Sequence, residues 1–171
     1  MSLPTTISTS RLTLVVWTRG EVADIRAGHR RPEWHPDYPR QDDVDAAGLV
    51  IARANAGKDL SWGPRHIVRE GVAVGSIGFF GPPDDDVEQP EVEVGYGLVE
   101  DARGLGLATE ALQGVLAETD ARGVRVRASV EPTNAPSIKV LAKCGFTDLR
   151  GTDEEGNLVF ARPLPAAARR P

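Results

Sequence analysis

The residues from Arg103 to Ala108, with glycines at positions 104 and 106, have the composition of a loop that binds phosphate. They follow an apolar run, Val92 to Val99, which is typical of a strand, and they lead into an amphipathic helical pattern. Such a turn directs unpaired backbone N–H groups toward one point, where the helix dipole favours negative charge. Because glycine lets a ligand approach the backbone closely, the segment predicts a site for a phosphate-bearing ligand.

Three common phosphate loops do not fit this segment. A P-loop requires Lys followed by Ser or Thr after its last glycine, whereas Gly106 is followed by Leu107 and Ala108. The dinucleotide fingerprint requires Gly or Ala where this chain has Thr109, and a protein-kinase loop requires a lysine and catalytic-loop partners that the sequence lacks. An ATP- or NAD-binding domain is therefore the least favoured interpretation.

Four blocks of the sequence, taken in order, resemble one known family. Residues 9–14 match the pattern T-x-R-L-x-L, residues 93–98 are similar to E-I-G-Y-x-L, and residues 134–146 resemble N-x-x-S-x-x-V-L-x-K-x-G-F. Residues 103–108 match Q/R-x-x-G-x-G/A. These are motifs of the GNAT N-acetyltransferase superfamily, in particular of the branch that includes the ribosomal-protein N-terminal acetyltransferases. The blocks are specific for superfamily and cofactor, and they are silent on the substrate.

The resemblance implies acetyl-CoA as the cofactor, bound mainly by the main chain. Its pyrophosphate would lie on the N–H groups of the glycine loop, and its pantetheine would pair with the backbone of the preceding strand. The implied cofactor-binding residues are Leu98, Val99, Arg103, Gly104, Leu105, Gly106, Leu107, Ala108, Asn134 and Ser137. Because this binding uses the main chain, the side chains at 105 and 107 would be free to vary. The alternative is a glycine-rich turn that binds no ligand.

Acetyl transfer to an amine requires loss of an amine proton, polarisation of the thioester oxygen and support for the leaving thiolate. By the resemblance, Glu93 is the base, acting directly or through a water, and Glu91 on the same strand face is the second candidate. The family's usual tyrosine acid is replaced by Leu141, which leaves Ser137 to hydrogen-bond the sulfur. Alternatively, the carboxylates are solvent-facing, Ser137 is only a helix-facing hydroxyl, and Asn134 is only a helix cap.

The segment from Arg30 to Arg40 is rich in proline and aromatic residues, and in relatives this connection walls the acceptor cleft. Trp34, His35 and Tyr38 are therefore candidate substrate-binding residues, unless they simply pack the loop onto the sheet. The three histidines show no paired metal spacing, so no metal is predicted. Cys144 has no histidine beside it in sequence, and we interpret it as a small buried apolar residue.

The composition excludes several classes of protein. A net charge of −5 argues against a broad nucleic-acid surface, and no apolar run is long enough for a membrane span. No signal peptide is visible, and the single cysteine excludes an intramolecular disulfide and suits a cytoplasmic protein.

The elements needed to position these residues can be read from the sequence pattern. Strands are predicted at 11–17, 62–69, 72–80, 91–99, 124–130 and 159–161, and helices at 18–28, 42–56 and 104–122, followed by a short helix capped by Asn134 and ended by Gly145. The predicted fold is α/β (α+β), a single domain over residues 1–162. By the resemblance, a mixed, mostly antiparallel sheet of six to seven strands, flanked by about four helices, would splay to form the acetyl-CoA cleft. Residues 163–171 are predicted to be a disordered tail.

The sequence therefore predicts an acetyl-CoA-dependent N-acetyltransferase that transfers the acetyl group directly to a primary amine, on a protein N-terminus or a small molecule. The alternative is a non-catalytic acyl-CoA-binding or regulatory module of the same fold, because the usual tyrosine is missing. The identity of the amine and the oligomeric state, including a homodimer, stay open.

Overall fold

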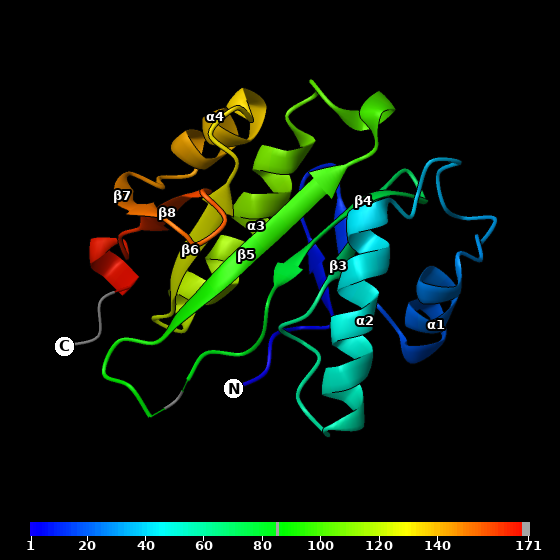
Figure 1. The fold of residues 1–171 in the computed structure, drawn as a ribbon, viewed down its shortest axis with the longest axis horizontal. Coiled ribbons are helices and arrows are strands. Elements are labelled where there is room, and N and C mark those ends of the chain that lie inside the picture. The colour runs from blue at the N-terminus through cyan, green and yellow to red at the C-terminus, as the bar shows by residue number, and fades with distance from the viewer. Residues whose placement is uncertain (85, 169–171) are drawn as a thin grey trace.

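The computed structural model describes residues 1–84 and 86–168, and in this part of the chain eight strands and four α-helices form one sheet with helices on both faces (Figure 1). The elements are β1 (Thr6–Ser8), β2 (Thr13–Val16), α1 (Arg19–Ala27), α2 (Gln41–Asn55), β3 (Arg65–Arg69), β4 (Val72–Phe79), β5 (Glu91–Leu98), α3 (Leu107–Ala121), β6 (Arg125–Val130), α4 (Ala135–Lys143), β7 (Asp148–Thr152) and β8 (Leu158–Arg162), with short 3₁₀ helices at Glu100–Ala102 and Ala166–Ala168.

The strand order across the sheet is β1-β2-β3-β4-β5-β6-β8-β7, and the pairs are antiparallel apart from β5 with β6. The helix α3 forms the crossover between these two parallel strands, as a parallel connection requires. Figure 1 shows α2 over β3 and β4 on one face, with α3 behind β5 on the other.

Local sequence signals explain where the helices that flank the site begin and end. Thr18 and Glu21 form a reciprocal capping box at the start of α1, and Gly28 closes this helix in the left-handed conformation. The Asn134 side chain accepts a hydrogen bond from the Ser137 N–H at the start of α4, as predicted. The bounds of α1 and the start of α4 are therefore set by residues next to those helix ends.

The sheet opens between β5 and β6. In the described part of the chain, residues 91–93 pair with residues 125–127, and the two strands pair nowhere else. Beyond this point β5 continues along β4 as far as Leu98, whereas β6 continues along β8 to Val130. Figure 1 shows the two strands side by side at their first residues and separating toward their C-terminal ends. This separation creates an open edge in the middle of the sheet.

The predicted fold class is confirmed, with two strands that the sequence patterns did not indicate. The strand β1 has three residues in a Ser/Thr-rich stretch, and β7 is an edge strand with all five residues exposed. Residues 169–171 of the predicted disordered tail lie outside the described residues, while its Leu164 is buried. No helix in the described ranges is both long and apolar enough to cross a membrane.

A buried aromatic cluster fixes the 30–40 loop against the sheet. The hydroxyl of Tyr38 lies 2.8 Å from Nδ1 of His66, and the rings of Trp34 and Trp17 pack against the same imidazole. His66 is 3% exposed, and its Nε2 lies 3.2 Å from a Glu21 carboxylate oxygen without alignment for a hydrogen bond. Burial lowers the pKa of His66 from its ordinary value, although Glu21 acts in the opposite direction.

The His66 environment predicts a loss of stability in mild acid. Because the pKa of His66 is lower in the folded chain, the unfolded chain binds a proton at a higher pH than the folded chain does. The free energy of unfolding should therefore be constant above about pH 7 and fall as the pH drops below about 6.5, by at most about 1.4 kcal/mol per pH unit. Urea unfolding across pH 5 to 8 should show this fall in the wild type and lose it in His66→Gln. The exposed His29→Gln should behave like the wild type, and equal slopes in all three proteins would contradict the assignment.

Candidate active site

The glycine loop has the geometry of an anion-binding turn. Gly104 and Gly106 have φ angles of 75° and 76°, the left-handed conformation that glycine adopts without strain, and Gly106 is the N-cap of α3. Among the described residues, no carbonyl accepts from the backbone N–H groups of residues 104–109. The loop and the first turn of α3 therefore present several free donors on the positive end of a helix dipole.

Arg11 adds a positive charge to this loop, and the sequence reading did not assign it to the site. Its Nη1 donates to the Leu105 carbonyl at 2.9 Å, and its Nε donates to Glu110 at 2.7 Å. The Thr9 hydroxyl donates to the other oxygen of the Glu110 carboxylate. The start of the chain is thereby fastened to the first turn of α3, with a guanidinium beside the glycines. The T-x-R-L block was the signal that could have placed Arg11 here.

The β5 residues predicted to bind pantetheine differ in what their main chain faces. The Val99 N–H donates to the Val74 carbonyl at 2.9 Å, so this donor is already engaged with the β4 side. Because alternate residues of an antiparallel strand direct their main-chain groups to opposite sides, the N–H and C=O of Leu98 face the open edge. Nε of Arg103 donates to the Leu98 carbonyl at 3.2 Å, which places this guanidinium at the end of the edge.

The remaining loop residues divide between surface and core. Leu105 is 45% exposed, whereas Leu107 is 1% exposed and packs in the hydrophobic core. The expectation that the side chain at 107 is free to vary is therefore wrong, since α3 uses it to pack against the sheet.

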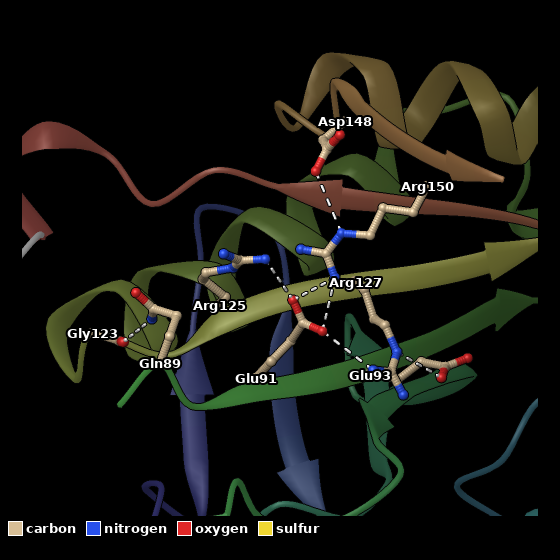
Figure 2. Close-up of polar contacts among 8 residues, drawn as sticks. All are labelled: Gln89, Glu91, Glu93, Gly123, Arg125, Arg127, Asp148 and Arg150. Carbon is tan, nitrogen blue, oxygen red and sulfur yellow. Dashed lines mark hydrogen bonds and ion pairs between the residues drawn. The ribbon is translucent and has the colours of Figure 1, made fainter. Parts of the chain in front are cut away.

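The two β5 carboxylates lie in an arginine-rich cluster on one face of the sheet (Figure 2). Both oxygens of Glu91 are engaged, by Arg125 at 3.1 Å, Arg127 at 3.2 Å and Arg150 at 2.9 Å. Glu91 thus links β5 to β6 and β7, and both of its carboxylate oxygens are used in these ion pairs. One oxygen of Glu93 lies 3.3 Å from Nε of Arg127, and the described residues offer no partner to the other oxygen. Glu93 keeps a free acceptor atom that Glu91 lacks.

Two hydroxyl groups meet across the opening. Tyr96 of β5 places its hydroxyl 3.0 Å from the Ser137 hydroxyl of α4, and burial raises the pKa of Tyr96 to about 12. Leu141, at the position of the family's usual tyrosine, is 1% exposed and belongs to the core. Cys144 is also buried, which raises the pKa of its thiol and argues against a nucleophilic role. The sequence reading missed Tyr96, although the E-V-G-Y-G-L block contains it.

The aromatic residues of the 30–40 loop lie mostly in the core. Trp34 and Tyr38 are 3% and 0% exposed and pack against His66, so the structure places them away from any surface that a substrate could reach. His35 faces Asp101 at 3.3 Å and accepts a hydrogen bond from the Asp37 N–H. Ligand atoms of these three residues lie within 4.8 Å of one another, but exposed acidic groups commonly gather without binding an ion.

A groove of about 390 Å³ lies on the α2 side of the sheet. Its walls are formed by α2 and the loop before β3, and its floor by β4 and β5. From the sequence, no acceptor residue is predicted on α2, because the aspartates of its first turn, Asp43 among them, are ordinary helix-start residues, and Arg40 is only the end of the 30–40 loop. The groove reaches β5 from one face of the sheet, and the open edge lies on the side of β5 where β6 departs.

Comparison with solved structures shows the same fold in acetyltransferases. Mycobacterium smegmatis RimJ in complex with CoA-disulfide has a TM-score of 0.67 and 24% identity, covering 98% of this chain and 94% of that one. The ribosomal L7/L12 α-N-protein acetyltransferase RimL, in complex with coenzyme A, has a TM-score of 0.68 and 17% identity, covering 93% and 98%. The microcin C7 self-immunity acetyltransferase MccE, in complex with acetyl-CoA and AMP, has a TM-score of 0.65 and 17% identity, covering 94% and 97%.

Comparison with curated proteins gives no match. A family model described as an acetyltransferase (GNAT) domain matches residues 11–147, a range that includes the glycine loop, β5 and α4. The chain therefore belongs to the GNAT acetyltransferase family.

Proposed function

We propose that this protein transfers an acetyl group from acetyl-CoA directly to a primary amine, on a small molecule or a protein N-terminus. Acetyl-CoA is the cofactor, and it supplies the activated acetyl thioester when bound. One observation carries the proposal: β5 and β6 separate beside a loop whose amides have no partner in the described chain. An open strand edge next to an anion-binding turn suits an elongated ligand with a diphosphate group.

The residues of the opening divide the binding task between main chain and side chains. The amides of the glycine loop would hold the diphosphate, with positive charge from Arg11 and Arg103 nearby. The main-chain groups of Leu98 would pair with the amide-bearing part of the ligand, at the edge that β6 leaves open. The Arg103 guanidinium, now on the Leu98 carbonyl, would move aside for that pairing.

Glu93 would accept the amine proton through water. It lies five residues before Leu98 on β5, roughly 16 Å along the strand, which is too far for direct contact with an amine at Leu98. Its side chain faces the side of the sheet where the groove lies, since Glu93 alternates in step with Gly95 and Gly97, whose added Cβ atoms would meet the groove residues Phe80 and Arg40. A chain of waters along this face would connect the two.

Ser137 would donate a hydrogen bond to the departing sulfur, and Tyr96 would orient the Ser137 hydroxyl. The Tyr96 hydroxyl contacts both the hydroxyl and the carbonyl oxygen of Ser137, which limits the rotation of the serine side chain. This pair takes the place of the tyrosine that relatives carry at the position of Leu141. Buried Cys144 supports direct transfer without an acetyl-enzyme.

Replacing Gly106 should weaken coenzyme binding. Alanine in the left-handed conformation costs roughly 1–2 kcal/mol, so Gly106→Ala would turn the loop amides away from their common focus. The dissociation constant for CoA, measured by calorimetry, should rise about tenfold or more. Gly156→Ala is the matched control, because Gly156 has a φ of 85° in the turn between β7 and β8. Unchanged CoA affinity in both variants would remove the loop from the site.

Replacing Glu93 should slow turnover without weakening CoA binding. Glu93→Gln removes the proton acceptor and should reduce kcat by at least about 100-fold, the lower end of general-base contributions. Glu91→Gln is the matched control on the same strand face; it should reduce thermal stability but leave kcat near the wild-type value. Release of CoA thiol at saturating amine, followed from pH 6 to 9, measures both variants. An unchanged kcat for Glu93→Gln over this range would exclude Glu93 as the base.

Replacing Ser137 should affect departure of the thiolate. A hydrogen bond to a charged group is worth about 1.5–3 kcal/mol, so Ser137→Ala should lower kcat roughly 10- to 100-fold. Ser137→Thr keeps a hydroxyl and should retain most of the activity, and Tyr96→Phe should fall between the two. Equal activity of the alanine and threonine variants would count against this role. CoA binding without turnover of any amine, in the wild type, would instead support the non-catalytic module.

A further inference from the structure

The groove between α2 and β4 contains a built polar site at one end. Arg40 donates through Nε and Nη2 to both oxygens of Asp43, at 2.9 and 2.8 Å, and through Nη2 to the Ser76 hydroxyl at 3.3 Å. Asp43 is 1% exposed and Ser76 is 8% exposed. The Arg40 N–H also donates to Asp43, at 2.8 Å. The guanidinium is therefore held in one orientation by a buried carboxylate and a buried hydroxyl.

One nitrogen of this guanidinium, Nη1, can still donate to a ligand. Among the described residues, no acceptor contacts Nη1 of Arg40, and the side chain is 19% exposed. This nitrogen lies against Gly97, where an added Cβ would be 1.8 Å away, so only glycine allows this position. Gly97 directly precedes Leu98, whose main chain faces the open edge. An N–H donor without an acceptor in the described chain is thus held beside the residue that is proposed to pair with the coenzyme.

The rest of the groove is apolar with acidic residues. Leu49 and Phe80 are 56% and 52% exposed and line it with Val50 and Leu60, so an apolar side chain of a ligand can pack there. Of its charged lining residues, Arg40 and Asp43 neutralise each other, which leaves Asp42, Asp45 and Asp59 against Arg53. This lining attracts an ammonium group and accommodates an apolar side chain, whereas Arg40 requires an oxygen acceptor.

Resting on the proposed function, we propose that Arg40 binds an oxygen on the carbon next to the reacting amine, so that the acceptor is an α-amino compound with an apolar side chain. A carboxylate of a free amino acid and the first carbonyl of a peptide N-terminus share this chemistry. In either case, an oxygen bound to Nη1 of Arg40 would hold the neighbouring α-amine close to Gly97 and Leu98. A simple amine carries no oxygen at this position and so lacks the contact with Arg40.

The test compares L-leucine, L-leucinamide and isopentylamine, which carry the same apolar chain with a carboxylate, an amide and neither. Each acceptor is measured with wild type, Arg40→Lys and the double variant Arg40→Gln/Asp43→Asn, which keeps the buried site neutral and hydrogen-bonded. The ratio of variant to wild-type kcat/KM for one acceptor cancels the intrinsic reactivity of its amine. We expect KM-dominated losses of about 10- to 100-fold for the carboxylate or the amide, and under about twofold for isopentylamine.

Arg53→Gln is the matched control, since Arg53 lines the same groove but donates to the Phe80 carbonyl at the other end. It should change all three acceptors equally. Larger loss for leucine identifies a free amino acid, and larger loss for leucinamide identifies a peptide N-terminus; both support the proposal. Equal losses for all three acceptors in the Arg40 variants, or the same selectivity in Arg53→Gln, would overturn it.

Calorimetric titration of leucine and leucinamide into the CoA-bound protein separates this inference from the proposed function. Binding that depends on Arg40 without any acetylated product would refute the transferase and keep the acceptor site. If the Arg40 variants acetylate isopentylamine at the wild-type rate, and neither leucine nor leucinamide shows binding that depends on Arg40, the acceptor site is refuted and the transferase activity stands. Circular dichroism melts of the Arg40 variants show whether each variant is folded, so that a loss of activity is not caused by unfolding.

Discussion

The short parallel pairing between β5 and β6 is the constraint on which the site depends. Two strands that pair over residues 91–93 and 125–127 and then separate must leave main-chain groups without strand partners. Unpaired groups of this kind are stable where water or a ligand can reach them, and unstable when buried. In the opening, β5 therefore has no strand partner on one side. The adjoining glycine loop supplies N–H donors for the charged end of a ligand that binds there. The fold and the proposed chemistry share one cause.

The carboxylate–arginine cluster marks where this pairing ends. Glu91 and Glu93 alternate with Val92 and Val94, so the acidic side chains meet arginines on one face while the valines pack into the core on the other. Partly exposed pairs of this kind contribute little individually, but one carboxylate shared by three arginines resists the slippage that a short pairing allows. We infer that Glu91 sets the register, which leaves Glu93 with a free oxygen at the start of the opening.

How much the sequence could predict follows from the range of each interaction. Helix caps and the glycine turn are local, so Asn134, Gly106 and the β3–β4 hairpin could be placed from neighbouring residues. The polar edge strands β1 and β7 lack an apolar pattern and could not. Contacts between distant segments, such as Arg11 with Glu110, leave no periodic spacing in the sequence, so only the family motif T-x-R-L could have pointed to this one. The aromatic residues of the 30–40 loop illustrate the same limit, because their burial against His66 depends on a strand about thirty residues away.

The Arg40–Asp43 pair is better explained by positioning than by stability. Removing two charges from water costs several kcal/mol per ion, and an apolar pair of similar volume is often as stable. Here the two residues sit at the N-terminus of α2, three positions apart, and a serine from β4 completes the site beneath a glycine of β5. Asp43, Ser76 and Gly97 therefore together fix one guanidinium, and one of its nitrogens has no acceptor among the described residues. A purely structural ion pair would have no need of Gly97, since a side chain at that position would only have displaced the arginine from the end of the groove.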